Sequence, residues 1–170
     1  MLELKKINEL TKSQLDEFIQ DWGNEKIIPS SLQKYEQGYD KFVSFLNTME
    51  IDPPRLMVPS TMFFLVEDDN IVGTIEIRHF LNDGLLKYGG HIGYGVAPSF
   101  RGNGYAQKMF ERVKPFLKNL GLEMVLICCN KENKASEKTI LNCGGNLENK
   151  VDLIQNGKHG TFCRYWVEVK

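Results

Sequence analysis

Apolar residues recur at helical spacing in two stretches near the start of the chain. The first stretch follows Thr11 and Gln14, which form a capping-box pattern, and it ends at Gly23. The second follows Pro29, and the proline-rich segment 52–59 after it is expected to be irregular. The apolar positions that predict the two helices are Leu15, Phe18, Ile19 and Trp22, and then Tyr35, Tyr39, Phe42, Leu46 and Met49.

From residue 62 onwards, short apolar runs typical of strands alternate with two more amphipathic helices. The longer helix carries an apolar stripe from Ala106 to Leu120, and Pro115 is expected to kink or shorten it. The shorter helix is expected at about 133–142, before the pair Gly144 and Gly145. The predicted strands are 62–67 and 71–80 (a hairpin), 91–96, 124–129, and a last hairpin of 150–155 and 160–169.

The order of these elements predicts the fold class. Two helices come first, antiparallel strands follow, and then one strand–helix–strand–helix passage leads to a closing hairpin. This order favours an α/β fold of the α+β kind, with a mixed, mostly antiparallel sheet flanked by helices. At 170 residues the chain is expected to form a single domain, 1–170, that buries its own core.

Composition excludes several classes of function. The net charge is −1 with acidic and basic residues interspersed, so a nucleic-acid partner is not expected. No apolar run approaches the length of a membrane span, and the N-terminus lacks the apolar region of a signal peptide, so a cytoplasmic protein is expected. Cysteine and histidine spacing predicts no metal site, and Cys128 and Cys129 are expected to be reduced, buried thiols.

The stretch 96–106, Val-Ala-Pro-Ser-Phe-Arg-Gly-Asn-Gly-Tyr-Ala, carries the main chemical signal. It joins a predicted strand to the start of a predicted helix through a glycine-rich turn, where free backbone N–H groups and the helix dipole favour an anion. Gly102 and Gly104 leave no Cβ between these amides and a phosphate, and Arg101 adds a positive charge. The turn therefore predicts a cofactor that carries a pyrophosphate.

Other interpretations of these glycines fit less well. A dinucleotide-binding fingerprint needs Gly or Ala at its sixth position, where this chain has Gln107. A Walker A loop needs Ser or Thr after Gly-Lys, but His159 follows Gly157-Lys158. The remaining alternative is that the turn is only a tight connection between a strand and a helix.

The pattern Arg101-x-x-Gly104-x-Ala106 after Val96-x-Pro98 resembles the acetyl-CoA-binding loop of the GNAT superfamily of N-acetyltransferases. The strand 124–129, followed by Asn133, Ala135 and Ser136, resembles the next segment of that superfamily, and the stretches 77–82 and 89–94 resemble a bacterial subgroup. The resemblance implies the GNAT fold, with a strand that splays from its neighbour to admit the pantetheine arm. The cofactor-binding residues that it implies are Val96, Arg101, Gly102, Asn103, Gly104, Tyr105, Ala106, Asn133 and Ser136.

Transfer of an acetyl group to an amine needs a base, because an ammonium group has no lone pair. The candidates are His91 first and then Glu76 and Tyr94, with His79 also near a strand end. Strand alternation argues against His91, since it projects from the face opposite to Val96 unless a bulge intervenes. Many members of the superfamily carry a proton-donating tyrosine seven residues after the asparagine.

Seven residues after Asn133 this chain has Ile140 in place of the family's tyrosine. Tyr94, Cys143 or water would have to supply the proton to the leaving thiolate, or the domain does not catalyse. The resemblance implies an enzyme that moves an acetyl group from acetyl-CoA to a primary amine of a small molecule or peptide. The acceptor site would draw on Tyr35, Tyr39, Trp166 and the loop 52–60. The alternative is a non-catalytic acyl-CoA-binding sensor or scaffold. A homodimer is also an open expectation.

Overall fold

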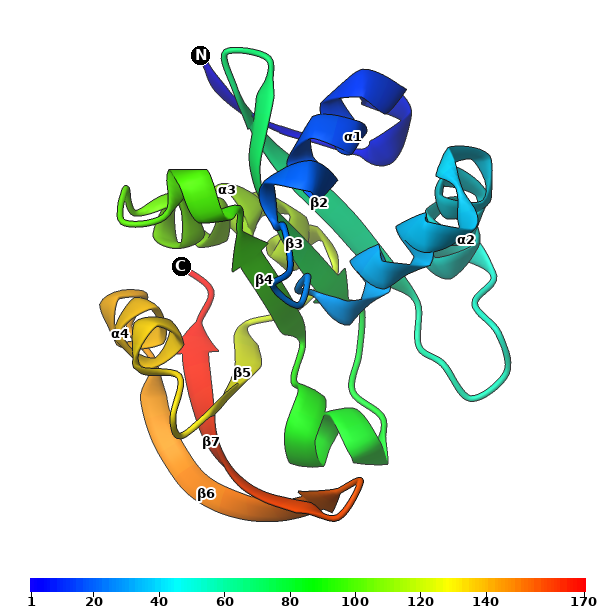
Figure 1. The fold of residues 1–170 in the computed structure, drawn as a ribbon. Helices are drawn as coiled ribbons and strands as arrows, with labels where there is room; N and C mark the ends of the chain where they lie inside the picture. Colours follow the sequence, from blue (N-terminus) through cyan, green and yellow to red (C-terminus); the bar gives the residue numbers. More distant parts are fainter.

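The computed structural model describes residues 1–170, with the exception of the side chain of Gln155. Two separate antiparallel sheets form its centre (Figure 1). The first has the strand order β1-β2-β3-β4, and the second has the order β5-β7-β6. The strands are β1 (Leu2–Lys5), β2 (Ser60–Glu67), β3 (Asn70–Arg78), β4 (Ile92–Val96), β5 (Met124–Asn130), β6 (Asn146–Gln155) and β7 (Lys158–Glu168).

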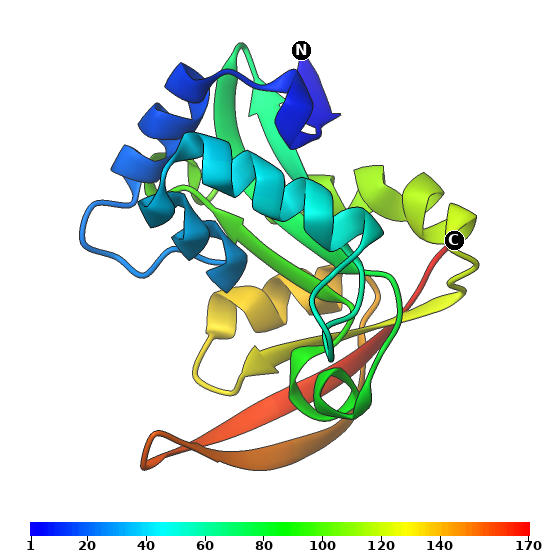
Figure 2. The ribbon, with the colours of Figure 1, turned by 90° about the vertical axis from the view of Figure 1, so that its right-hand side faces the viewer.

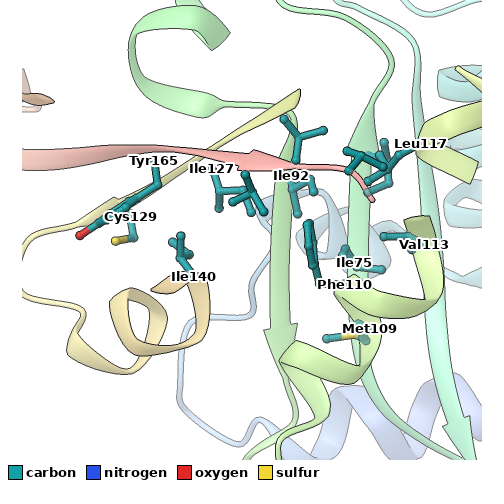
Figure 3. Packing of buried hydrophobic residues seen from close by; sticks show 14 of the residues in the cluster. Ile75, Ile92, Met109, Phe110, Val113, Leu117, Ile127, Cys129, Ile140 and Tyr165 are labelled. Carbon is teal, nitrogen blue, oxygen red and sulfur yellow. The ribbon is translucent and has the colours of Figure 1, made fainter. Parts of the chain in front are cut away.

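Helices cover both faces of the first sheet (Figure 2). Side chains of α1 and α2 pack with those of β2 in one buried cluster, whereas α3 packs on the opposite face of β3. The residues of α3 belong to another buried cluster, which also includes residues of α4 and of the second sheet. Phe110, Ile127 and Ile140 meet in this core (Figure 3). The helices are α1 (Lys12–Asp21), α2 (Tyr39–Ile51), α3 (Tyr105–Asn119) and α4 (Lys134–Asn142), with short helical turns at Ile7–Glu9, Ser30–Gln37, Leu85–Gly89 and Pro98–Phe100.

These elements confirm the expected α/β fold, and three local features differ from the prediction. The stretch after Pro29 forms a short helical turn and then α2, because Gly38 between them has φ +105°, which no helix accommodates. Strand β6 starts at Asn146 rather than 150, with a bulge between Leu147 and Asn149. Helix α3 is not shortened at Pro115 but continues to Asn119, with Val113 and Leu117 buried on either side of the proline.

A further strand, β1, was not predicted from the sequence. It pairs antiparallel with β2, with Leu2 opposite Glu67 and Lys5 opposite Phe64. Its four residues are too few to show a clear alternation, so its position depends on the edge that β2 offers.

The two sheets touch at one end and separate at the other. Gly90 and Ile127 form an isolated bridge, and the N–H of His91 donates to the carbonyl of Leu126 at 2.7 Å. Beyond this point β4 and β5 belong to different sheets. A gap therefore opens between the carboxyl end of β4 and α4.

Among the helices of the described part of the chain, none is both long and apolar enough to cross a membrane.

Candidate active site

A cleft of about 610 Å³ lies where β4 separates from the second sheet. Its walls are the end of β4, the turn that leads into α3, and the first turns of α4. Of the residues expected to bind a cofactor, those that line it are Val96, Arg101, Gly102, Gly104, Tyr105, Ala106, Asn133 and Ser136. These eight residues, from the end of β4, the turn before α3 and the start of α4, thus lie around one cavity.

The turn before α3 presents its backbone to the cleft. Gly102 and Gly104 have φ of +82° and +72°, and no atom lies within 4 Å of the place where a Cβ would stand on either. Within the described residues, the backbone N–H groups from Gly102 to Gln107 donate to no protein acceptor. Free N–H groups at the start of a helix, with the positive end of its dipole, form a site for an anion.

Asn103 is exposed and does not line the cleft, and its side chain bonds within the turn. Its side-chain amide donates to the carbonyl of Phe100 at 3.1 Å and to that of Arg101 at 3.3 Å. These bonds fix the shape of the turn and so position the free N–H groups.

Arg101 reaches the rim of the cleft, but its guanidinium group is already paired. Nη2 lies 2.8 Å from the Glu25 carboxylate, and Nε donates to the carbonyl of Val96 at 3.3 Å. The guanidinium carbon also stands 5.4 Å from the centre of the Trp22 ring, which adds a cation–π contact. In this arrangement the charge of Arg101 faces a carboxylate and not the free N–H groups of the turn.

Asn133 and Ser136 form the opposite wall, at the start of α4. The Asn133 side-chain oxygen accepts from the N–H of Ser136 at 3.0 Å, so Asn133 is the cap of this helix. The hydroxyl of Ser136 is 2.6 Å from the hydroxyl of Tyr94 on β4, and the two share a hydrogen bond. This bond spans the gap between β4 and α4.

Tyr94 lines the cleft and is the catalytic candidate that the structure places there. Burial raises the pKa of its hydroxyl to about 12, despite the opposing effect of the hydrogen bond with Ser136, so the group is protonated at neutral pH. Ile140 stands where many members of the family have the proton-donating tyrosine. It is only 1% exposed and packs in the core. Tyr94 and Ile140 also line one small cavity together, so the Tyr94 side chain adjoins this part of the core.

His91 lies outside the cleft, at the junction of the two sheets. The residue is 5% exposed, and its Nδ1 accepts the N–H of Leu126 at 2.9 Å. Burial, and secondarily the charge of Arg78, lower the pKa of the imidazole to about 4. The lone pair of Nδ1 is used in this hydrogen bond, and in the neutral ring Nε2 then carries the proton. This geometry disfavours His91 as a base, because no ring nitrogen is free to accept a proton.

Glu76 is buried on the face of β3 that α1 and α2 cover. Its Oε1 accepts from the hydroxyls of Ser31 at 2.9 Å and Ser60 at 3.2 Å, and Arg78 lies 3.7 Å from Oε2. Across the strand pair it stands opposite Gly93 of β4, one residue before Tyr94. Glu76 is thus a carboxylate beside the cleft strand but not in the cleft lining.

The residues expected to shape the acceptor site have structural partners here. The hydroxyl of Tyr35 donates to Asp16 at 2.5 Å, that of Tyr39 donates to the carbonyl of Leu10 at 3.4 Å, and the indole of Trp166 donates to Glu148 at 3.0 Å. His79, which the sequence offered as a candidate base, pairs with Thr61 at 2.8 Å. None of these side chains is among those that line the 610 Å³ cleft.

The sequence interpretation missed Ile28, which lines the cleft from the segment after α1. Its carbonyl oxygen would be 2.2 Å from a Cβ at Gly95, so the segment lies directly on the glycines of β4. The alternation Gly93-x-Gly95 was the available signal, since glycines in a strand often mark a close approach of another backbone.

Two further expectations concern cysteines and metals. Cys129 is buried and Cys128 half-buried, and both are free thiols whose pKa burial raises to about 11. In the part of the chain that the structure describes, no three His, Cys, Asp or Glu side chains are grouped so that they could hold a metal ion.

Comparison with known proteins identifies the family. The model for the acetyltransferase (GNAT) domain matches residues 6–146. A search of curated protein sequences finds no match.

Solved structures with the same fold cover almost the whole chain. A probable acetyltransferase is 21% identical with a TM-score of 0.68, covering 98% of this chain and 92% of that one. An N-acetyltransferase from Staphylococcus aureus is 16% identical with a TM-score of 0.68, covering 100% and 99%. Mutant forms of a spermidine/spermine N-acetyltransferase from Vibrio cholerae are 18% identical with a TM-score of 0.65, covering 99% and 95%. With a family match over most of its length and this fold, the chain belongs to the GNAT family of acetyl-CoA-dependent N-acetyltransferases.

Proposed function

We propose that this protein transfers an acetyl group from acetyl-CoA to a primary amine of a small molecule or peptide, with the cofactor in the cleft between β4 and α4. The observation that carries the proposal is the row of free N–H groups from Gly102 to Gln107 at the mouth of a 610 Å³ cleft. A pyrophosphate bound there would receive several backbone hydrogen bonds and the favourable field of the α3 dipole.

The edge of β4 supports a place for the pantetheine arm. The N–H of Ala97 donates to Val72, and the carbonyl of His91 accepts from Arg78, so the odd-numbered residues bond to β3. Because bonding directions alternate along a strand, the backbone groups of Tyr94 and Val96 point to the other edge, toward the cleft. The amides of the pantetheine arm would pair with this edge and bring the thioester close to Tyr94.

Tyr94 would assist the departure of the thiol. The amine nitrogen attacks the thioester carbon, the bond from carbon to sulfur breaks, and the sulfur leaves with the electron pair as a thiolate. The Tyr94 hydroxyl, protonated and held by Ser136, would donate its proton to that sulfur and regain a proton from solvent water. A thiolate is already a tolerable leaving group near neutral pH, so this assistance suffices without the usual tyrosine of α4.

The amine must lose a proton before or during the attack. Of the remaining candidates, Glu76 has a carboxylate on the face of β3 that adjoins the segment after α1, opposite Gly93. A carboxylate there would accept the proton through a water molecule. Glu76 therefore takes the place that the sequence interpretation gave first to His91.

The test is a panel of primary amines assayed for release of free CoA thiol from acetyl-CoA. The panel should contain an alkylamine, a polyamine, an aminoglycoside and a peptide with a free N-terminus, because one similar structure is a polyamine acetyltransferase. At least one amine should raise thiol release well above spontaneous hydrolysis, and Glu76→Gln should abolish most of that increase.

Calorimetry with acetyl-CoA, run in parallel, separates the possible failures. Binding without thiol release by any amine would favour the sensor or scaffold over the transferase. Absence of binding would contradict the cofactor site itself.

A further inference from the structure

A second, smaller cavity of about 10 Å³ adjoins the cleft. Tyr94, Ala106 and Thr139 line both spaces, so these three side chains form the boundary between them. The other side chains around the small cavity belong to the buried core or pack against it, and they come from both sheets, α3 and the end of α4 (Figure 3): Ile75, Ile92, Phe110, Ile127, Ile140 and Cys143.

The lining of the small cavity is apolar in its chemistry. Both hydroxyls of this described lining have partners: that of Thr139 donates to the carbonyl of Ala135 at 3.1 Å, and that of Tyr94 bonds to Ser136 at 2.6 Å. Burial raises the pKa of the Cys143 thiol to about 11, so the thiol is uncharged at neutral pH and only weakly polar. Because a buried water molecule needs about two to four polar partners, this lining favours a small apolar group instead.

The small cavity continues the path that the cofactor is proposed to follow. The pyrophosphate would lie at the turn before α3, and the pantetheine arm would run along the edge of β4 past Val96 to Tyr94. Ile92 lies two residues further along the same face of β4, toward the bridge of Gly90 and Ile127 where the two sheets meet. A group attached to the thioester carbon is therefore expected to point into the small cavity.

The size of the cavity limits what this group can be. A space of about 10 Å³ has room for about one small group, so a methyl group comes near to filling it and a longer chain exceeds it. Ile140 closes the side toward α4 and is 1% exposed. Its Cγ2 would stand 2.6 Å from a Cβ at Gly145, so the backbone after α4 lies directly against it. Ile140 cannot move back from the cavity without displacing this backbone.

We propose that the small cavity receives the methyl group of the acetyl donor, and that Ile140 is the specificity-determining residue that excludes longer acyl groups. Many members of the family carry their proton-donating tyrosine at this position, and in this chain the same position limits the length of the acyl group. This inference rests on the proposed function and adds to it the choice of acyl donor.

The first test compares propionyl-CoA with acetyl-CoA in the thiol-release assay, with the amine that the panel identifies. An extra methylene group in a tight apolar pocket changes kcat/KM by about 10-fold to 200-fold, so the wild type should prefer acetyl-CoA by at least about 10-fold. Ile140→Ala should bring the two donors within about threefold of each other, because it removes most of the side chain that closes the cavity. The ratio is unaffected by partial unfolding of a variant, since both donors meet the same folded fraction.

Ile77→Ala is the matched control. Ile77 is also buried in the same core, at 0% exposed, but it lies outside the lining of the small cavity. This variant should lose stability as Ile140→Ala does and keep the wild-type preference for acetyl-CoA. Ile140→Val is a milder change that should shift the preference in the same direction if Ile140→Ala does not fold. An unchanged preference in the Ile140 variants, or equal use of both donors by the wild type, would overturn the proposal.

Calorimetry separates this inference from the proposed function, because binding of an acyl-CoA needs no acceptor amine. Relative to acetyl-CoA, propionyl-CoA should gain about fourfold in affinity in Ile140→Ala, the effect of burying one more methylene group. If this gain appears and no amine releases thiol, the proposed transferase is wrong and the acyl pocket stands. If amines react but neither ratio changes, the acyl pocket is wrong and the transferase stands. Absence of CoA binding would contradict both.

Discussion

Tyr94 shows what single residues contribute and what the sequence can say about them. The chain lacks a tyrosine on α4, where Ile140 fills the core instead, and it has one on β4 that reaches α4 through Ser136. The substitution at 140 was visible in the sequence. The meeting of Tyr94 with Ser136 was not, because it depends on how far β4 and α4 stand apart.

Replacing Tyr94 with Phe should lower kcat by about 10²-fold with an active amine, at the low end for loss of a proton donor, because a thiolate can leave unaided. The affinity for acetyl-CoA should stay within about twofold, since the proposed cofactor contacts are made by backbone groups. Tyr165→Phe is the matched control: that tyrosine is also buried, with a pKa raised to about 12, but lies outside the cleft lining. Equal kcat values for both variants would exclude Tyr94 as the donor.

At the scale of elements, periodicity located the helices and strands well wherever one face is buried. It failed where local sequence does not decide the outcome: β1 is only four residues long, and Gly38 interrupts a continuous apolar pattern by its φ. The glycine-rich turn before α3 was predicted correctly, together with the strand and helix on either side. Its glycines are a direct sign of the backbone conformation that the turn requires. Gly102 and Gly104 adopt the left-handed region that glycine favours.

Gly104→Val should reduce CoA affinity by at least about 10²-fold, because a branched side chain would stand among the free N–H groups of the turn. The fold should persist, since no protein atom lies within 4 Å of the new Cβ. Gly121→Val offers the matched control: φ there is +76°, the surroundings are equally open, and the position follows the far end of α3. Both variants should lose similar stability in urea unfolding, but only Gly104→Val should lose affinity in calorimetry.

At the scale of the whole molecule, the division into two sheets creates the cleft. The order of elements in the sequence predicted one mixed sheet. Only the family resemblance implied that β4 splays from the next strand, because contacts between residues far apart in the chain decide whether β4 and β5 pair. The junction depends on His91, whose backbone and ring both bond to Leu126.

Stability should therefore depend on the protonation of His91. The pKa of its ring falls from the ordinary 6.5 to about 4 on folding, so the unfolded chain binds the proton more readily. The stabilisation is complete above pH 6.5 and is lost as the pH falls toward 4, by about 3 kcal/mol at most. Between pH 7 and pH 5, the free energy of unfolding measured in urea should fall more for the wild type than for His91→Gln. The exposed His159→Gln should behave as the wild type does, and parallel losses in all three would refute the role of the junction.

The free N–H groups of the turn have a consequence for how this protein can change over generations. Every residue except proline carries the same main-chain N–H group, so mutational drift can exchange many side chains around the cleft and leave these N–H groups in place. Gly102 and Gly104 are different, because their positive φ is a conformation that other residues rarely adopt. A single nucleotide change at either codon can remove in one step a site that many other changes would leave intact.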